Sequence, residues 1–178
     1  MAIRVALNGF GRIGRNILRS AWNDPEITFV HINDLASDKI LAHLLKYDSV
    51  HGTFPGEIFF HEGSLNINSS EVKFFGERDP SIVPWDELGV EVVIDATGIF
   101  KNKEDLSKHL RGSVKKVILC APGAKDIDKT IVMGINDEEY SPADHNIISN
   151  ASCTTNCLAP VAKVLNDNFG IENGFMTT

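Results

Sequence analysis

The fold of this chain is decided near its start, where residues 3–14 read IRVALNGFGRIG. Residues 3–7 form an apolar run typical of a buried strand, and residues 8–14 then carry three glycines in the spacing G-x-G-x-x-G. Residues 12–22 follow with apolar side chains at helical spacing, which places the glycines in a strand-to-helix turn. A turn of this kind is typical of a doubly wound parallel sheet that binds a dinucleotide.

Each glycine has an expected task in such a turn. Gly9 allows the tight turn, Gly11 lets the backbone approach a pyrophosphate, and Gly14 lets the helix pack on the strand. Asp34 follows the second expected strand, where a carboxylate accepts both ribose hydroxyls and repels a 2′-phosphate. The pattern therefore favours NAD over NADP. The alternative is a tight strand-to-helix turn that binds no ligand, in which Asp34 is only a turn residue.

The rest of the chain alternates strand-like and helix-like runs, which predicts a Rossmann-type α/β fold. Expected strands cover residues 28–32, 90–94, 114–120, 130–133 and 146–148, and expected helices cover residues 38–46, 103–110 and 152–169. Residues 47–85 interrupt this order with glycines and prolines, so we expect short antiparallel hairpins inserted beside the parallel sheet. Asp38 is the expected cap of the second helix. Residues 175–178 read as the first half of a further strand.

Composition excludes several classes of protein. A net charge of −7 argues against nucleic-acid binding, which requires clustered Lys and Arg. No apolar run approaches the ~18 residues of a membrane span, and the start shows no secretory signal. Three cysteines make no disulfide framework, so free thiols in a reducing, cytoplasmic compartment are expected. The six histidines lack metal-ligand spacing, so no metal site is expected.

A second motif lies at residues 149–157, which read SNASCTTNC. Cys153 falls in the first turn of the last expected helix, where free amides and the helix dipole stabilise a thiolate. The hydroxyls of Ser152 and Thr154 are suited to an anionic substrate at the same helix terminus. These residues alone leave two alternatives open, an inert core thiol and a metal site. The metal site lacks a second Cys or His pair at ligand spacing.

Taken together, these motifs resemble glyceraldehyde-3-phosphate dehydrogenase. The resemblance extends over the whole chain and is carried by residues 8–14, 43–52, 95–98, 121–123, 149–157 and 168–171. It implies an NAD-binding Rossmann domain over residues 1–151 and the first helix of an incomplete catalytic domain over residues 152–178. It also implies that the chain is a fragment, because the family's activating histidine and its other phosphate-binding groups follow the segment that ends at Thr178.

The resemblance implies the glycolytic oxidation of glyceraldehyde 3-phosphate to 1,3-bisphosphoglycerate with NAD and inorganic phosphate. Cys153 would form a thiohemiacetal and then a thioester, in a protein that assembles as a homotetramer. This chain alone is expected to bind NAD weakly. It is also expected to turn over little or nothing, because it would lack a general base that contributes ~10²–10⁴ in rate. Two alternatives stay open. They are an erythrose-4-phosphate dehydrogenase and a non-catalytic nucleotide-binding or redox-sensing module that uses Cys153 and Cys157.

The family's motifs carry specific roles over to this sequence. The expected cofactor-binding residues are Asn8, Gly9, Gly11, Arg12, Ile13, Gly14, Asp34, Arg78, Thr97, Gly98 and Cys120. Ser152 and Thr154 are expected to contact phosphate beside the nucleophile Cys153. Cys120 departs from the family, which usually has Ser or Thr at this position, so a weaker hydrogen-bonding group is expected near the nicotinamide.

Overall fold

The structure, a computed structural model, describes residues 2–61 and 63–178. The strands of its main sheet are β1 (Ile3–Asn8), β2 (Ile27–Asn33), β5 (Ile58–His61), β6 (Ser64–Ile67), β7 (Ser70–Phe75), β8 (Val92–Asp95), β9 (Lys116–Leu119), β10 (Lys129–Thr130) and β11 (Ile147–Ser149). A separate antiparallel pair joins β3 (Tyr47–Asp48) to β4 (Gly52–Thr53). The helices are α1 (Arg12–Ala21), α2 (Asp38–Lys46), α3 (Lys103–Ser107) and α4 (Cys153–Phe169), with 3-10 turns η1 (Pro80–Ile82), η2 (Trp85–Leu88) and η3 (Asp137–Glu139).

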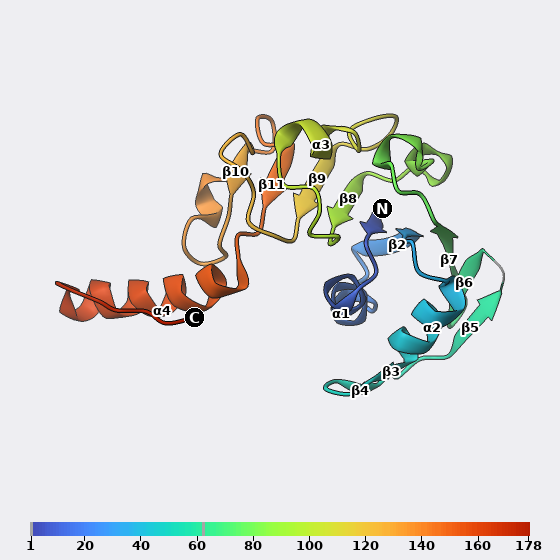
Figure 1. The fold of residues 1–178 in the computed structure, drawn as a ribbon, viewed down its shortest axis with the longest axis horizontal. Coiled ribbons are helices and arrows are strands. Elements are labelled where there is room, and N and C mark those ends of the chain that lie inside the picture. Colours follow the sequence, from blue (N-terminus) through green and yellow to red (C-terminus); the bar gives the residue numbers. More distant parts are fainter. Residues whose placement is uncertain (1, 62) are drawn as a thin grey trace.

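The main sheet follows the order β10-β11-β9-β8-β1-β2-β7-β6-β5 (Figure 1). The strands from β10 to β7 are parallel, whereas β6 and β5 are added antiparallel at one edge. This arrangement confirms the predicted Rossmann-type sheet with inserted antiparallel hairpins.

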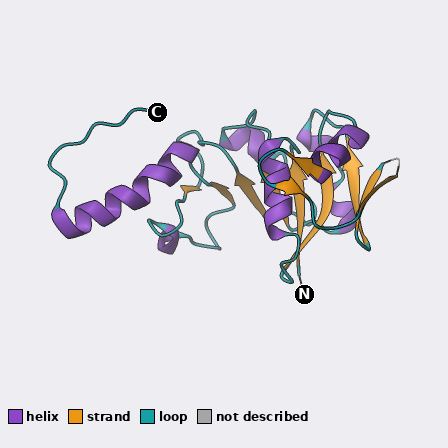
Figure 2. Ribbon diagram, turned by 90° about the horizontal axis from the view of Figure 1, so that it is seen from below, coloured by secondary structure: helices purple, strands orange, loops and turns teal. Residues whose placement is uncertain are grey.

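Helices cover both sides of the parallel strands (Figure 2). α1 contributes Leu18 to an apolar cluster that contains Leu7 of β1, whereas η2 contributes Trp85 to a second cluster that contains Ala6. Successive side chains of a strand point to opposite faces, so these two clusters lie on opposite sides of the sheet. Burial on both faces explains why the central strands are rich in Val, Ile and Leu rather than alternating with polar residues.

The order of the strands creates a crevice beside β1. The chain leaves β1 to build β2 on one side and returns after β7 to place β8 on the other. Where the strand order reverses in this way, the loops at the carboxyl ends of the two strands diverge, and doubly wound folds bind their ligands there. The glycine turn after β1 lies at this point.

The structure corrects several expected element ends. Ser37, rather than Asp38, caps α2, because its hydroxyl accepts a hydrogen bond from the Ile40 amide. α3 ends at Ser107, short of the expected end at residue 110, because the amides of the next residues form tighter i→i−3 turns. β10 covers only Lys129–Thr130 instead of the expected residues 130–133. Residues 175–178 form no strand. A strand requires a hydrogen-bonded neighbour, and in the described part of the chain none lies beside this segment.

α4 projects away from the sheet, and the residues that follow it run back along the helix (Figures 1 and 2). The apolar face expected on this helix is exposed, with Leu158 at 42%, Val161 at 56% and Leu165 at 47%. Ala151, between β11 and α4, has a left-handed backbone with φ of 57°. This sharp turn gives α4 its direction and places Cys153 immediately after it.

One buried histidine predicts a pH dependence of stability. His31 in β2 is fully buried between Phe75 and Trp85, and neither ring nitrogen has a hydrogen-bond partner among the described residues. Burial, with smaller contributions from the charges of Lys73 and Arg4, lowers the pKa of His31 to about 4. Below about pH 6.5, His31 is therefore protonated in the unfolded chain but stays neutral in the folded chain. We expect the free energy of unfolding to fall by about 2 kcal/mol between pH 7 and pH 5 from this group alone.

Urea denaturation as a function of pH measures this effect. His31→Phe keeps an apolar ring in the site and is expected to flatten the slope between pH 7 and pH 5. The matched control is His43→Phe at an exposed position, which is expected to leave the slope unchanged. Equal slopes for His31→Phe and the parent chain would show that His31 is not the titrating group.

Candidate functional site

The glycine turn after β1 is packed too tightly for side chains at two of its three glycines. Gly9 has φ of 91°, and a Cβ there would lie 2.8 Å from the Thr97 amide nitrogen. A Cβ on Gly14 would lie 2.1 Å from the Gly9 carbonyl oxygen, so α1 approaches the turn backbone to backbone. A Cβ on Gly11 would meet nothing within 4 Å. Gly9 and Gly14 therefore form the turn itself, whereas Gly11 leaves an open surface above it.

Asp34 is tied to the glycine turn. One carboxylate oxygen accepts a hydrogen bond from the Phe10 amide at 2.6 Å, and the other accepts one from the Ala36 amide at 2.9 Å. The Asp34 amide in turn donates to the Phe75 carbonyl at 2.9 Å. These bonds hold the carboxylate at the carboxyl end of β2, next to the open surface at Gly11.

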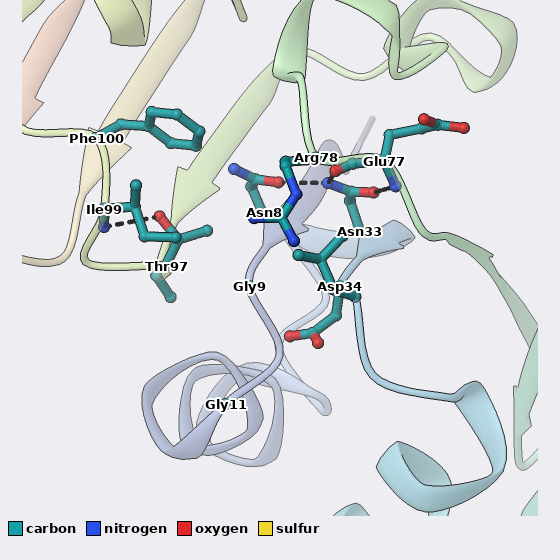
Figure 3. A pocket seen from close by; sticks show the side chains of 12 residues that line it. Asn8, Gly9, Gly11, Asn33, Asp34, Glu77, Arg78, Thr97, Ile99 and Phe100 are labelled. Carbon is teal, nitrogen blue, oxygen red and sulfur yellow. Dashed lines mark hydrogen bonds between the residues drawn. The ribbon is translucent and has the colours of Figure 1, made fainter.

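A pocket of about 450 Å³ opens between these elements (Figure 3). It is lined by Asn8, Gly9, Gly11, Asn33, Asp34, Leu35, Glu77, Arg78, Ala96, Thr97, Ile99 and Phe100. Six of the residues expected at a cofactor site line it together: Asn8, Gly9, Gly11, Asp34, Arg78 and Thr97. The pocket runs from Asp34 and Arg78 at one end to Thr97 and Phe100 at the other (Figure 3).

Sequence reasoning missed several residues of this pocket. Asn33 and Glu77 adjoin predicted residues, and their positions at strand ends were the available signal. Ile99 and Phe100 follow the motif at residues 95–98, and nothing in their local sequence indicates a ligand. Asp95, at the end of β8, is fully buried and supports the pocket from below without lining it.

Other expected cofactor residues lie outside the pocket lining. The Arg12 side chain forms an ion pair with Asp48, and hydrogen bonds from the His51 and Val50 amides lower the pKa of Asp48 to about 2. Ile13 is half exposed on α1, and Gly98 follows Thr97 with a left-handed φ of 69°.

Cys120 lies in a different place. It lines a neighbouring pocket with Ile118 and Tyr140, over the part of the sheet formed by β8, β9 and β11. Burial, with a contribution from the Asp95 charge, raises the pKa of its thiol to about 11. A thiol with this pKa is protonated at neutral pH.

Cys153 is an exposed free thiol in the first turn of α4. Ser152 caps the helix, since its hydroxyl accepts a hydrogen bond from the Thr155 amide at 2.9 Å. The Asn156 amide makes the first intrahelical bond, to the Ser152 carbonyl, so the amides of Cys153 and Thr154 precede the helical ladder. The exposed thiol of Cys153 therefore lies beside free amides at the N-terminal end of a 17-residue helix.

Residues 2–61 and 63–178 contain no group of three or more His, Cys, Asp or Glu side chains arranged to hold a metal ion. Within the same residues, no helix combines the length and the apolar character needed to cross a membrane.

Comparison with known proteins gives two family matches. Residues 3–103 match the model of the glyceraldehyde 3-phosphate dehydrogenase NAD binding domain, and residues 152–178 match the model of the C-terminal domain of the same family. The two matched ranges contain the features described above: the glycine turn lies in the first range, and Cys153 lies in the second.

Curated relatives match along the whole chain. Glyceraldehyde-3-phosphate dehydrogenase 1 of Bacillus cereus is 58% identical over 175 residues, which cover 98% of this chain and 52% of the relative. Glyceraldehyde-3-phosphate dehydrogenase 1 of Bacillus subtilis (strain 168) is 53% identical over 178 residues, covering 100% and 53%. Glyceraldehyde-3-phosphate dehydrogenase of Geobacillus stearothermophilus is also 53% identical over 178 residues, with the same coverage. The chain spans about half the length of the curated relatives it matches. Since the NAD binding domain model covers more than half of its residues, the chain belongs to the glyceraldehyde-3-phosphate dehydrogenase family and contains that family's NAD-binding domain.

Proposed function

We propose that this chain supplies the NAD site and the nucleophile of a phosphorylating glyceraldehyde-3-phosphate dehydrogenase. The observation that carries the proposal is the combination of two features in one chain. A pocket at the reversal of the strand order fits a dinucleotide, and an exposed cysteine lies in the first turn of a long helix. The names of the relatives support glyceraldehyde 3-phosphate as the substrate.

The pocket residues fit NAD by their chemistry. The Asp34 carboxylate lies where it accepts hydrogen bonds from the two hydroxyls of the adenosine ribose. The open surface at Gly11 leaves room for a pyrophosphate, with the first amides of α1 at Arg12 and Ile13 beside it. Arg78 borders the adenine end, and Thr97 and Gly98 lead toward the nicotinamide ribose. When bound, NAD supplies the hydride acceptor for the oxidation step.

Cys153 performs the covalent chemistry in this proposal. Its thiolate attacks the aldehyde carbon of glyceraldehyde 3-phosphate, and the carbonyl oxygen takes a proton to give a thiohemiacetal. This adduct would lose its hydride to bound NAD and its hydroxyl proton to a general base, which leaves a thioester on Cys153. Inorganic phosphate then attacks the thioester carbon and releases the thiolate, which gives the acyl phosphate 1,3-bisphosphoglycerate. The hydroxyls of Ser152 and Thr154 flank the thiol and are placed to hold a phosphate group at the helix N-terminus.

We also propose that residues 1–151 and 152–178 belong to different domains. The left-handed Ala151 turns the chain away from the sheet at this boundary, and α4 shares no apolar cluster with the sheet among the described residues. The Thr178 hydroxyl lies 3.3 Å from the Thr154 hydroxyl, next to Cys153.

The assembly and the compartment are further parts of the proposal. By resemblance to its family, the whole protein forms a homotetramer, which sedimentation at several concentrations tests. Three free cysteines suit the reducing environment of the cytoplasm.

The reaction is tested directly in the whole protein that contains this chain. NADH formation is followed by absorbance with glyceraldehyde 3-phosphate, NAD and inorganic phosphate present together. Turnover that requires all three supports the proposal. Faster turnover with erythrose 4-phosphate would assign the protein to that substrate instead, and no turnover with either aldehyde would overturn the proposal.

Asp34 is expected to set the choice of cofactor. In the parent chain, calorimetric titration should show NAD binding at least about tenfold tighter than NADP binding, because a carboxylate repels the 2′-phosphate. Asp34→Ser removes the charge, so the NAD/NADP affinity ratio should fall by roughly tenfold. Asp38→Ser is the matched control, since Asp38 is a nearby carboxylate outside the pocket lining. An unchanged ratio in Asp34→Ser would contradict the assigned role.

A further inference from the structure

Asn33 holds an exposed segment of the pocket wall by both of its amide atoms. Its side-chain nitrogen donates to the Glu77 carbonyl at 2.8 Å, and its side-chain oxygen accepts from the Glu77 amide at 2.8 Å (Figure 3). Asn33 itself is only 4% exposed, at the end of β2. The peptide groups on both sides of Glu77 are therefore fixed to one buried side chain.

Asn33 is in turn part of a chain of hydrogen bonds below the pocket. Its second amide hydrogen is donated to the Asn8 side-chain oxygen at 2.8 Å, and the Asn8 nitrogen donates to Asp95 at 2.7 Å. Asp95 also accepts from the Thr97 hydroxyl at 2.7 Å and the Thr97 amide at 3.1 Å. The chain of bonds crosses the ends of the neighbouring strands β2, β1 and β8. Each member limits the movement of the next, so Asn33 is held in one orientation.

The bonding capacity of Asn33 decides how it can act. A side-chain amide has two donor hydrogens, and both of them are already used within the protein. Asn33 lines the pocket but has no donor left for a ligand. Arg78, the next residue after the clamped Glu77, is exposed and borders the same pocket. Only the second lone pair of its oxygen could accept a hydrogen bond from a ligand, so the main effect of Asn33 is expected to pass through the segment that carries Arg78.

We propose that Asn33 is a positioning residue for nucleotide binding, which places Arg78 at the adenosine end of the pocket by clamping Glu77. The proposal rests on the proposed NAD site and adds to it a residue that acts through the backbone of another. Preorganised segments bind with less loss of conformational entropy, so release of the clamp should weaken binding without removing any direct contact.

The chain contains a matched control for this clamp. The Asn136 side-chain oxygen accepts from the Val132 amide at 2.8 Å, and its nitrogen donates to the Thr130 carbonyl at 3.0 Å. This clamp has the same chemistry but lies outside the nucleotide pocket. Asn136→Ala therefore reports the effect of losing an asparagine clamp on stability alone.

A double-mutant cycle tests the proposal, with ADP as the probe and calorimetric titration of the 178-residue chain as the measurement. Asn33→Ala is expected to weaken ADP binding about tenfold, and Asn136→Ala is expected to leave it unchanged. Because Asn33 acts through Arg78, the double variant Asn33→Ala, Arg78→Ala should bind ADP no more weakly than Arg78→Ala alone. Circular dichroism verifies that each variant is folded. If Asn33→Ala does not fold, Asn33→Leu, which keeps a similar size and loses both donors without adding a charge, takes its place with the same expectations.

Three results would overturn the proposal. Unchanged ADP affinity in Asn33→Ala would show that the clamp does not position the site. Multiplicative losses in the double variant would show that Asn33 acts independently of Arg78, and an equal loss in Asn136→Ala would show a general loosening of the fold. In all three cases the parent chain still binds ADP and NAD, so the proposed NAD site stands. Absence of binding in the parent chain would overturn the site and the clamp together.

Discussion

Replacing Cys153 with serine is expected to lower turnover of the whole protein by at least about 10⁴-fold. At neutral pH a serine hydroxyl is almost entirely protonated and is a far weaker nucleophile than a cysteine thiol. Cys153 is exposed, and the cap of α4 is made by Ser152, so the substitution leaves the packing and the capping bond intact. The loss should therefore appear in kcat, measured as NADH formation, with NAD affinity unchanged.

The matched control is Cys157→Ser. Cys157 is also an exposed free thiol on α4, but it lies one turn further along, beyond the free amides of the helix terminus. This variant should keep turnover within about threefold of the parent. Iodoacetamide provides a second measurement, because alkylation at pH 7 should modify Cys153 faster than Cys157. Turnover that survives in Cys153→Ser, or that is lost equally in Cys157→Ser, would assign the nucleophile to another group.

The parts of the fold that could be predicted depend on local sequence. Apolar runs identify the buried strands, and the G-x-G-x-x-G spacing identifies the turn from β1 into α1, because both patterns are contained in short stretches of sequence. The cap at Ser152 and the position of Cys153 follow from the same local logic. The identity of the reaction, in contrast, came from resemblance rather than from periodicity or spacing.

The parts that could not be predicted depend on contacts between distant residues. Asn33 and Glu77 are 44 residues apart, and no local pattern indicates that an asparagine side chain clamps that peptide. Cys120 follows a strand that ends near the pocket, yet it lines the neighbouring pocket. The expected strand over residues 175–178 shows the same limit, because whether a suitable sequence forms a strand depends on a partner that the sequence does not identify.

Gly14→Ala is expected to lower the free energy of unfolding by about 3 kcal/mol. Two effects oppose each other at this position. Alanine in a helix interior is favoured over glycine by up to about 1 kcal/mol, which would stabilise α1. The new Cβ would, however, lie 2.1 Å from the Gly9 carbonyl oxygen, a backbone atom that cannot rotate away. The helix must shift from the turn, and the clash outweighs the gain in helix propensity.

Gly11→Ala separates this packing role from ligand binding. Gly11 has φ of −68°, which alanine adopts without strain, and its Cβ would meet nothing within 4 Å. Because alanine is a poorer N-cap than glycine, the free energy of unfolding should fall by up to about 1 kcal/mol, well below the loss expected for Gly14→Ala. Its NAD affinity should still fall by roughly tenfold or more, because the methyl group occupies the surface that the pyrophosphate approaches. Urea denaturation and NAD titration of both variants test this division. If Gly11→Ala binds NAD as tightly as the parent chain, the phosphates do not lie over the glycine turn, and the open surface at Gly11 is not the pyrophosphate site.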